Sequence, residues 1–154
     1  IPDILRSFEK NKPVIIRNPK ATRPWQHVLE PLSGYLILAQ KIYNNHKEYA
    51  EGWNFGPREE DVKPVGWILD KMISKWPDSS WELDQNSNPH EADFLKLDIS
   101  KAESKLGWKP VWELSHTIDK IIDWHKAWLD KEDMQAVCLA EIEEYTKDMS
   151  NENY

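Results

Sequence analysis

Features that signal common kinds of site are scarce in this 154-residue chain. The single cysteine, Cys138, excludes an internal disulfide, and this fits a reducing compartment. Only five glycines are present, and none of them lies in a strand–turn–helix phosphate loop of the dinucleotide-binding or P-loop kind. We therefore predict that this stretch of sequence encodes no cofactor-binding loop.

Long apolar runs and an excess of basic residues are also missing. No run approaches the length of a bilayer-spanning segment, and the first residues lack the pattern of a secretory signal. The 20 Lys and Arg are outnumbered by 27 Asp and Glu, which gives a formal net charge of −7 and argues against a nucleic-acid surface. We expect a soluble, cytoplasmic protein that binds neither nucleic acid nor membranes.

Metal and catalytic patterns are equally sparse. The five histidines show neither a His-x-x-x-His spacing nor cysteine partners, so we predict no metal site. Tyr43 and Lys47 have the Tyr-x-x-x-Lys spacing that places a phenol and an ammonium on one helical face. Because Tyr43 fits a buried apolar stripe and Lys47 lies past the expected helix end, we interpret this pair as a coincidence. No catalytic residue is predicted in this chain.

The rest of the chain alternates helical patterns with short runs that suit strands. Helices are predicted near residues 1–12, 32–45, 64–77, 98–107, 115–130 and from about 134 onward. Strands are predicted at residues 14–16, within 51–57 and at 81–83, with an extended arm at 94–97. This alternation indicates an α/β or α+β fold. So few strands would leave several helical stripes uncovered, and we therefore expect a large sheet-forming part upstream of Ile1.

Three local predictions concern the helices. The helix expected from Leu32 should bury one stripe, made of Leu32, Tyr35, Leu36, Ala39, Ile42 and Tyr43. Asp98 and Ser115 suit the N-terminal caps of the two later helices. Gly107 suits a left-handed C-terminal cap.

The best binding candidate is the run from Arg23 to Pro31, Arg-Pro-Trp-Gln-His-Val-Leu-Glu-Pro. Pro24 biases Arg23 toward an extended conformation, and Pro31 suits the first turn of a helix. A guanidinium next to the N–H groups of a helix start is a candidate clamp for phosphate or carboxylate. The structural alternative is an arginine on a rim, with Trp25 and Val28 filling the core.

A family resemblance strengthens the binding interpretation. It is carried by residues 13–19 (Pro-Val-Ile-Ile-Arg-Asn-Pro), 23–34 (Arg-Pro-Trp-Gln-His-Val-Leu-Glu-Pro-Leu-Ser-Gly), 50–57, 90–92, 95–98, 100–102 and 106–108. In order along essentially the whole chain, these runs resemble the CDP-glucose 4,6-dehydratase family of the extended short-chain dehydrogenases/reductases. The block 23–34 is quite specific to this family, whereas looser relatives share only an Arg-aromatic-His-Val pattern and a Leu-Gly-Trp ending.

The resemblance implies that residues 1–154 are the C-terminal, nucleotide-sugar-binding portion of a larger NAD-dependent lyase. The implied fold is the last strands and helix of a Rossmann sheet plus a small, mostly helical α+β substrate domain. The family converts CDP-D-glucose to CDP-4-keto-6-deoxy-D-glucose and water, a step of deoxysugar biosynthesis for lipopolysaccharide O-antigen. The NAD-binding Rossmann portion and all catalytic residues would lie upstream, so the fragment should be inactive alone. The full-length enzyme would be a homodimer.

The resemblance also implies roles for six residues. Arg23 matches the family arginine that holds the pyrophosphate, and Val14 and Ile16 match the strand that flanks the base. His90 stands where many relatives carry a second phosphate-binding arginine, and a neutral imidazole donates only one hydrogen bond. Arg17 is a candidate to compensate. Trp25 completes the set of candidate substrate-binding residues, its role left open.

Two other functions fit parts of the sequence. Nine tryptophans suit a carbohydrate-binding or protein-interaction module without catalysis, although large aromatics more often fill cores and interfaces. The second alternative is a related nucleotide-sugar epimerase or dehydratase with a different base preference.

Overall fold

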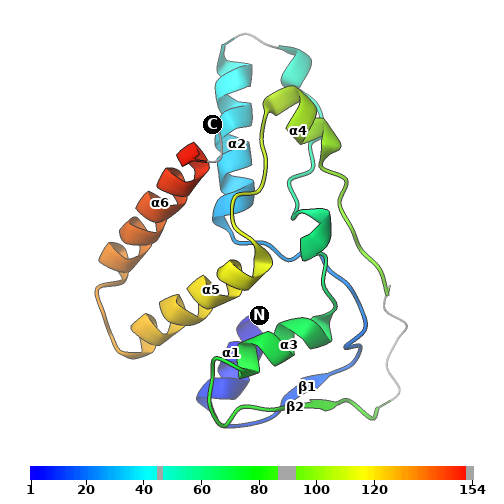
Figure 1. The fold of residues 1–154 in the computed structure, drawn as a ribbon, viewed down its shortest axis with the longest axis vertical. Coiled ribbons are helices and arrows are strands. Elements are labelled where there is room, and N and C mark those ends of the chain that lie inside the picture. The colour runs from blue at the N-terminus through cyan, green and yellow to red at the C-terminus, as the bar shows by residue number, and fades with distance from the viewer. Residues whose placement is uncertain (45–46, 87–92, 152–154) are drawn as a thin grey trace.

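A computed structural model describes residues 1–44, 47–86 and 93–151 of the chain. Helices and two strands alternate along it, as Figure 1 shows. The elements are α1 (Pro2–Glu9), β1 (Val14–Ile16), α2 (Leu29–Tyr43), the 3₁₀ helices η1 (Lys47–Tyr49) and η2 (Glu59–Asp61), α3 (Val65–Ile73), β2 (Trp81–Leu83), α4 (Ser100–Leu106), α5 (Leu114–Leu129) and α6 (Met134–Asn151).

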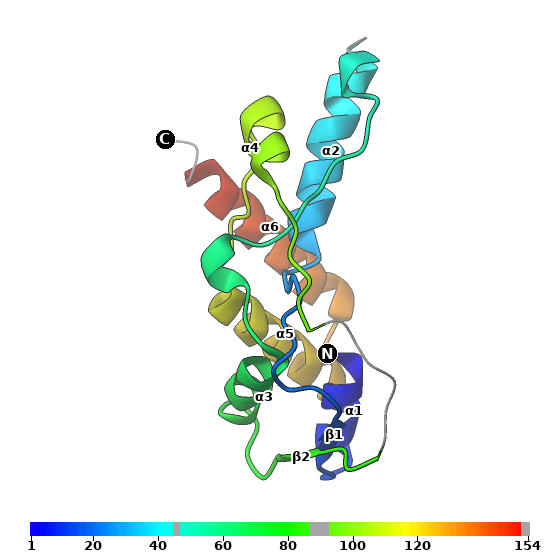
Figure 2. The same ribbon diagram turned by 90° about the vertical axis from the view of Figure 1, so that its right-hand side faces the viewer.

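The elements gather into two ends. Helices α2 and α4 lie at one end, and α1, α3 and both strands lie at the other (Figures 1 and 2). The largest core is at the second end, where α1, β1, α3 and α5 bury Ile4, Leu5, Phe8, Val14, Ile68, Leu69, Met72, Leu114, Ile118 and Ile122. A smaller core at the first end holds Phe55, Ala102, Leu106 and Trp108. A third group, Val111, Trp112 and Tyr145, joins the chain before α5 to α6.

The two strands form a parallel pair in which Val14 lies opposite Trp81 and Ile16 opposite Leu83. Both were predicted from their short apolar runs, and the mixed helical fold with a small parallel sheet agrees with the expected α/β class. The strand predicted within residues 51–57 is wrong. There the ring of Phe55 is buried in the smaller core, and its carbonyl accepts the side-chain amide of Gln26 at 2.9 Å instead of a ladder partner.

The orientation of α2 contradicts the predicted stripe. The helix begins at Leu29, three residues earlier than expected, and its predicted apolar stripe is exposed. Leu36 is 73% exposed and Tyr43 is 87% exposed. The packed side instead carries Gly34, because the ring of Phe55 lies so close that a Cβ at this position would be 2.3 Å from Phe55 Cδ1.

The predicted helix caps have mixed outcomes. Asp98 Oδ1 accepts the N–H of Ser100 at 2.9 Å at the start of α4, and Gly107 ends that helix at a φ of 69°. The prediction for Ser115 is wrong, because α5 begins at Leu114. The Leu114 N–H donates to Asp61 Oδ1 at 3.1 Å, so a carboxylate from a distant segment satisfies this helix start.

Helix α6 begins at Met134 as predicted, and the helical spacing of Cys138, Ile142 and Tyr145 predicts one buried stripe, of which only part is buried. Tyr145 is buried, whereas Ile142 is 46% exposed. Among the helices in the described ranges, none combines the length and the apolar character needed to cross a bilayer.

Candidate functional site

The segment that carries Arg23 is held against two distant parts of the chain. Its approach is a turn in which Asn18 Oδ1 accepts the N–H of Ala21 at 3.1 Å. The Thr22 N–H then donates to the carbonyl of Asp93 at 2.9 Å, and the Leu95 N–H donates to the Thr22 carbonyl at 3.3 Å. Thr22 therefore places Arg23 beside the stretch that follows residues 87–92.

Arg23 itself is half-buried. Its Nη1 donates to the Thr22 carbonyl at 2.8 Å, and its own carbonyl accepts the N–H of Trp25 at 2.9 Å. These two contacts with the backbone thus fix the position of Arg23 and the orientation of its guanidinium group. Its side chain lines none of three cavities that are formed by described residues. These cavities lie beside α4, between α1 and α5, and between α5 and α6.

The other predicted contacts are arranged around the small sheet. Val14 is buried in the main core, Ile16 is half-buried, and Arg17 is exposed directly after β1. The Asp84 N–H donates to the Ile16 carbonyl at 2.8 Å, so the carboxyl ends of both strands lie together. In parallel sheets this is the edge where ligands usually bind. His90 lies outside the described residues.

Trp25 packs its ring against the main core rather than standing on the surface. Its Nε1 is buried and has no hydrogen-bond partner within the described ranges. The same holds for Thr22 Oγ1 and Gln26 Oε1. Three buried polar atoms thus lie within five positions around Arg23, and each would gain from a partner, because an unpaired buried group costs about 1–3 kcal/mol.

The sequence did not reveal a buried polar network behind this segment. Glu30 is fully buried, and its Oε1 accepts the Trp112 N–H at 2.8 Å. Its Oε2 accepts the Val111 N–H at 3.0 Å and the Tyr145 hydroxyl at 2.7 Å. Burial raises the pKa of Glu30, although these three bonds oppose that shift. Glu30 therefore joins the start of α2 to α6 and to the chain before α5.

The network extends through Ser33. Its Oγ donates to the Glu30 carbonyl at 2.7 Å, accepts Trp108 Nε1 at 2.9 Å and lies 3.1 Å from the Tyr145 hydroxyl. The only signal of this network in the sequence was Glu30, an acidic residue in the first turn of a helix. A carboxylate at this position is ordinarily interpreted as a partner of the helix dipole.

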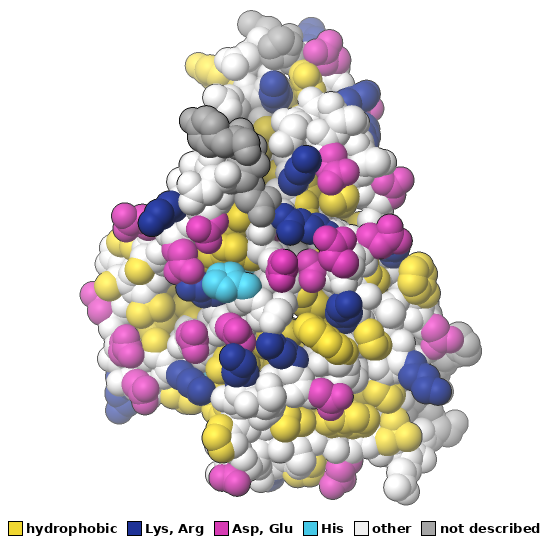
Figure 3. Space-filling view, in the orientation of Figure 1, with side chains coloured by type: hydrophobic (Ala, Val, Ile, Leu, Met, Phe, Trp, Pro, Cys, Tyr) yellow, Lys and Arg dark blue, Asp and Glu magenta, His cyan; other side chains and the backbone are white. Residues whose placement is uncertain are grey.

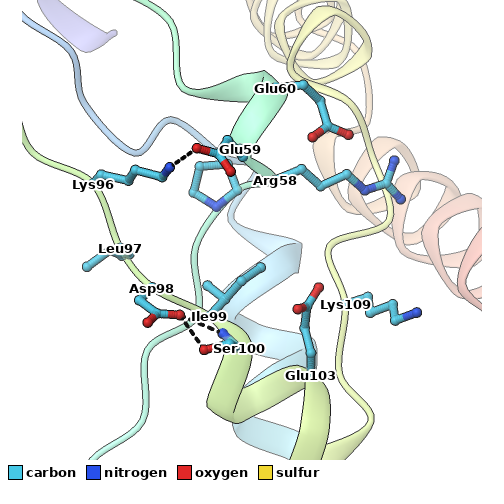
Figure 4. A pocket seen from close by; sticks show the side chains of 11 residues that line it. Arg58, Glu59, Glu60, Lys96, Leu97, Asp98, Ile99, Ser100, Glu103 and Lys109 are labelled. Atoms are coloured by element: carbon cyan, nitrogen blue, oxygen red, sulfur yellow. Dashed lines mark hydrogen bonds and ion pairs between the residues drawn. The ribbon is translucent and has the colours of Figure 1, made fainter.

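The largest of the three cavities, about 630 Å³, lies between residues 57–60 and 96–100 beside α4 (Figure 4). Charges of both signs line it, and two of them form an ion pair. Lys96 binds Glu59 and lowers the pKa of that carboxyl, and Figure 4 shows these two side chains directed toward each other. The hydroxyl and N–H of Ser100 likewise lower the pKa of Asp98. Basic and acidic side chains are thus mixed in this lining, which gives no clear preference for cations or for anions.

No group of three His, Cys, Asp or Glu side chains suited to a metal occurs among the residues placed by the structure. On the face shown in Figure 3, basic and acidic side chains are interspersed, with exposed hydrophobic side chains between them. This face therefore carries no basic patch of the kind that binds nucleic acid.

Comparison with known proteins identifies one clear relative. The sequence matches no family model. Over 146 residues it is 58% identical to the CDP-glucose 4,6-dehydratase of Salmonella typhimurium. The predicted resemblance is confirmed. The aligned region covers 94% of this chain but 41% of that dehydratase, so the chain spans less than half of its relative.

The similarity to the dehydratase is not confined to the Arg23 block, because it extends over nearly the whole chain. It therefore includes helices at both ends of the molecule and the chain that holds Glu30.

One buried histidine of the Arg23 block gives a prediction on stability. Burial, with smaller effects of His116 and Lys120, lowers the pKa of His27 from 6.5 to about 4. The unfolded chain therefore binds the proton more tightly, and stability is lost as the pH falls from the unfolded toward the folded value. Between about pH 7 and pH 5 we expect His27 to cost about 2 kcal/mol of unfolding free energy.

Urea unfolding of wild type and His27→Gln at both pH values measures this effect. Burial raises the pKa of Glu30 and of Glu141, which gives the opposite sign of pH dependence, so the difference between the two proteins is the quantity to follow. An advantage of wild type over His27→Gln that stays constant from pH 7 to pH 5 would contradict the prediction.

Proposed function

We propose that this chain is the nucleotide-sugar-binding portion of an NAD-dependent CDP-glucose 4,6-dehydratase. The observation that carries the proposal is 58% identity to such an enzyme over nearly the whole chain. In this reaction CDP-glucose becomes CDP-4-keto-6-deoxyglucose and water. NAD, held by a Rossmann portion outside this sequence, supplies the hydride acceptor at C4 and the hydride donor at C6. The catalytic residues belong to that portion as well, so this chain alone would bind substrate without turning it over.

Arg23 would hold the diphosphate. A guanidinium is a planar fork that binds two oxygens of a phosphate group at once, and its bond to the Thr22 carbonyl fixes its orientation. The backbone pairing of Thr22 with Asp93 and Leu95 brings the segment after residues 87–92 alongside. Two stretches distant in sequence would thus meet at the diphosphate.

The base would lie along β1. The side chain of Val14 is buried in the main core and anchors the strand. Ile16 and Arg17 are accessible enough to contact a ligand. Arg17 follows the carboxyl end of β1, where the parallel pair ends. It is therefore placed to supply a second cation, in place of the arginine that many relatives carry where this chain has His90. Trp25 would act from the core, by supporting the Arg23 backbone.

The exposed stripe of α2 supports a longer enzyme. Its exposed apolar side chains recur at helical spacing as Leu32, Tyr35, Leu36, Ile42 and Tyr43, and the exposed Val28 directly precedes the helix. A contiguous apolar face of this kind usually marks a packing surface. We infer that the Rossmann portion of the dehydratase packs on this stripe, because helices cover both faces of such a sheet.

The carbohydrate-module alternative is weaker, because most tryptophans contribute to packing. Trp108 and Trp112 are buried, and Trp25, Trp67, Trp76 and Trp81 pack partly against the main core. Trp53 stacks on Tyr49 with ring centroids 6.0 Å apart. Exposed parallel rings of the kind that bind extended sugars are not formed by these seven side chains.

Isothermal titration of this chain with CDP tests the proposal. We expect micromolar binding, reduced at least about tenfold by Arg23→Ala, since charge-assisted bonds to a phosphate contribute about 1.5–3 kcal/mol. Arg6→Ala is the matched control, because Arg6 is an exposed arginine paired with Asp3 on α1.

Competition by dTDP and GDP reports the base preference. Equal CDP affinity of the Arg23 and Arg6 variants would overturn the role of Arg23. Binding of glycans without nucleotide would overturn the proposed function as a whole.

A further inference from the structure

A separate cavity of about 270 Å³ lies where α1, residues 27–28, α5 and α6 meet. Its walls are mostly apolar and come from Leu5, Ile121 and Trp124. Val28, which is 62% exposed, forms part of its rim. A dry cavity of about 150 Å³ already holds benzene, so this volume accommodates a substituted ring.

Two polar side chains face each other on the lining of this cavity. The His27 side chain is 6% exposed, and that of Glu141 is 16% exposed. His27 Nδ1 accepts the N–H of Leu29 at 3.3 Å, so the ring proton lies on Nε2. Nε2 and Glu141 Oε1 are 3.6 Å apart, which is longer than a hydrogen bond. A donor and an acceptor therefore meet at this cavity without satisfying each other.

The third polar residue on the lining, His125, is already engaged. Its Nε2 lies 2.7 Å from Glu9 Oε1, and its ring is tilted against Trp76 and Trp128. The donor and the acceptor that face each other across the lining are thus those of His27 and Glu141.

We propose that this cavity binds a small, mostly apolar alcohol or phenol, whose hydroxyl accepts from His27 Nε2–H and donates to the Glu141 carboxyl group. The chemistry of the lining disfavours three other classes. An anion would be repelled by Glu141, a cation would pair with Glu141 but leave the imidazole N–H without an acceptor, and a hydrocarbon would leave both groups unpaired. A hydroxyl group is both acceptor and donor, so it satisfies the two at once.

Titration of the chain with p-cresol, followed by the indole N–H signal of Trp124, tests the site. We expect a Kd between about 10 μM and 1 mM, in keeping with the affinity that a ligand of this size can reach. Toluene, which has the same shape without the hydroxyl, should bind at least about tenfold more weakly, because it cannot form a hydrogen bond to the carboxyl group of Glu141.

Two pairs of variants locate the binding. Val28→Trp should close the rim and abolish p-cresol binding, whereas Leu36→Trp, at another exposed position on α2, should leave it unchanged. Glu141→Met should remove the preference for p-cresol over toluene, and Glu143→Met on the exposed side of α6 should not.

Several results would overturn the proposal. They are no saturable p-cresol binding at millimolar concentration, equal affinity for p-cresol and toluene in wild type, and unchanged binding in Val28→Trp. Circular dichroism checks the fold of each variant. If Glu141→Met does not fold, the two ligands and the Val28 and Leu36 pair still decide the question.

Discussion

Glu30→Ala should reduce the unfolding free energy of this chain by about 3–5 kcal/mol, because it leaves three buried donors without their acceptor and each unpaired group costs about 1–3 kcal/mol. The loss has a definite origin. Without the carboxylate, the N–H groups of Val111 and Trp112 and the hydroxyl of Tyr145 lose a buried acceptor. Domains are commonly stable by only about 5–15 kcal/mol, so the variant should lie close to unfolding. Urea unfolding followed by tryptophan fluorescence measures the change.

Two comparisons test the cause of that loss. Glu103→Ala changes the same residue type at an exposed position of α4 and should cost less than about 0.5 kcal/mol. Tyr145→Phe removes one of the three donors, so its effect should be less than additive with Glu30→Ala. A Glu30→Ala variant as stable as the Glu103 control, or strict additivity with Tyr145→Phe, would show that the network does not stabilise the fold.

The Glu30 network also has a pH dependence of defined sign. Burial raises the folded-state pKa of Glu30 above its ordinary value of 4.5, so the folded chain holds this proton more tightly than the unfolded chain. The contribution of Glu30 is therefore largest below the unfolded value and decreases as the pH rises through the folded value. The bonds from Val111, Trp112 and Tyr145 limit this decrease, because they favour the ionised form.

Local sequence signals predicted the elements well and their packing poorly. Residues 14–16 are a short β-branched run and residues 81–83 place a glutamate between two apolar residues, and both form strands. Gly107 ends α4 because a left-handed residue there suits glycine. The stripe of α2 was misjudged for a different reason. Helical spacing shows that one face is apolar, but it does not show which part of the chain covers that face.

The misjudged helix start of α5 has the same origin. Ser115 has the right chemistry for a cap, yet Asp61 reaches the Leu114 N–H from another segment. Long-range partners of this kind leave no spacing pattern in the sequence. Glu30 is the clearest example, since its partners are 81, 82 and 115 residues away along the chain.

The candidate site was predicted mainly through resemblance. The prolines around Arg23 indicated an extended segment, and the Thr22 pairing with Asp93 and Leu95 adds a neighbour that the sequence did not suggest. Trp25 was left open because one residue cannot reveal which surface its ring faces. The main core against which it packs is built from α1, β1, α3 and α5, and the last two of these are distant in sequence.

Gly34→Val should reduce the unfolding free energy by about 3 kcal/mol or more, at the upper part of the range for overpacked cores. A Cβ at Gly34 would lie 2.3 Å from Phe55 Cδ1, and the Phe55 ring cannot move aside easily. It packs edge-on against Trp108 and Tyr35, with centroids 5.0 Å and 5.4 Å away. Thermal unfolding and the near-ultraviolet circular dichroism of the tryptophans would report the loss.

Gly52→Val is the matched control for this clash, because nothing lies within 4 Å of a Cβ at Gly52. It should change stability by less than about 0.5 kcal/mol, as exposed substitutions usually do. Phe55→Ala should partly rescue Gly34→Val, since the space vacated by the ring accepts the new methyl groups. If the double variant is less stable than the sum of the two single effects predicts, the clash with Phe55 is not the cause. Rescue would instead establish that position 34 requires glycine because α2 approaches residues 54–56 closely. The same close approach orients the apolar stripe of α2 outward.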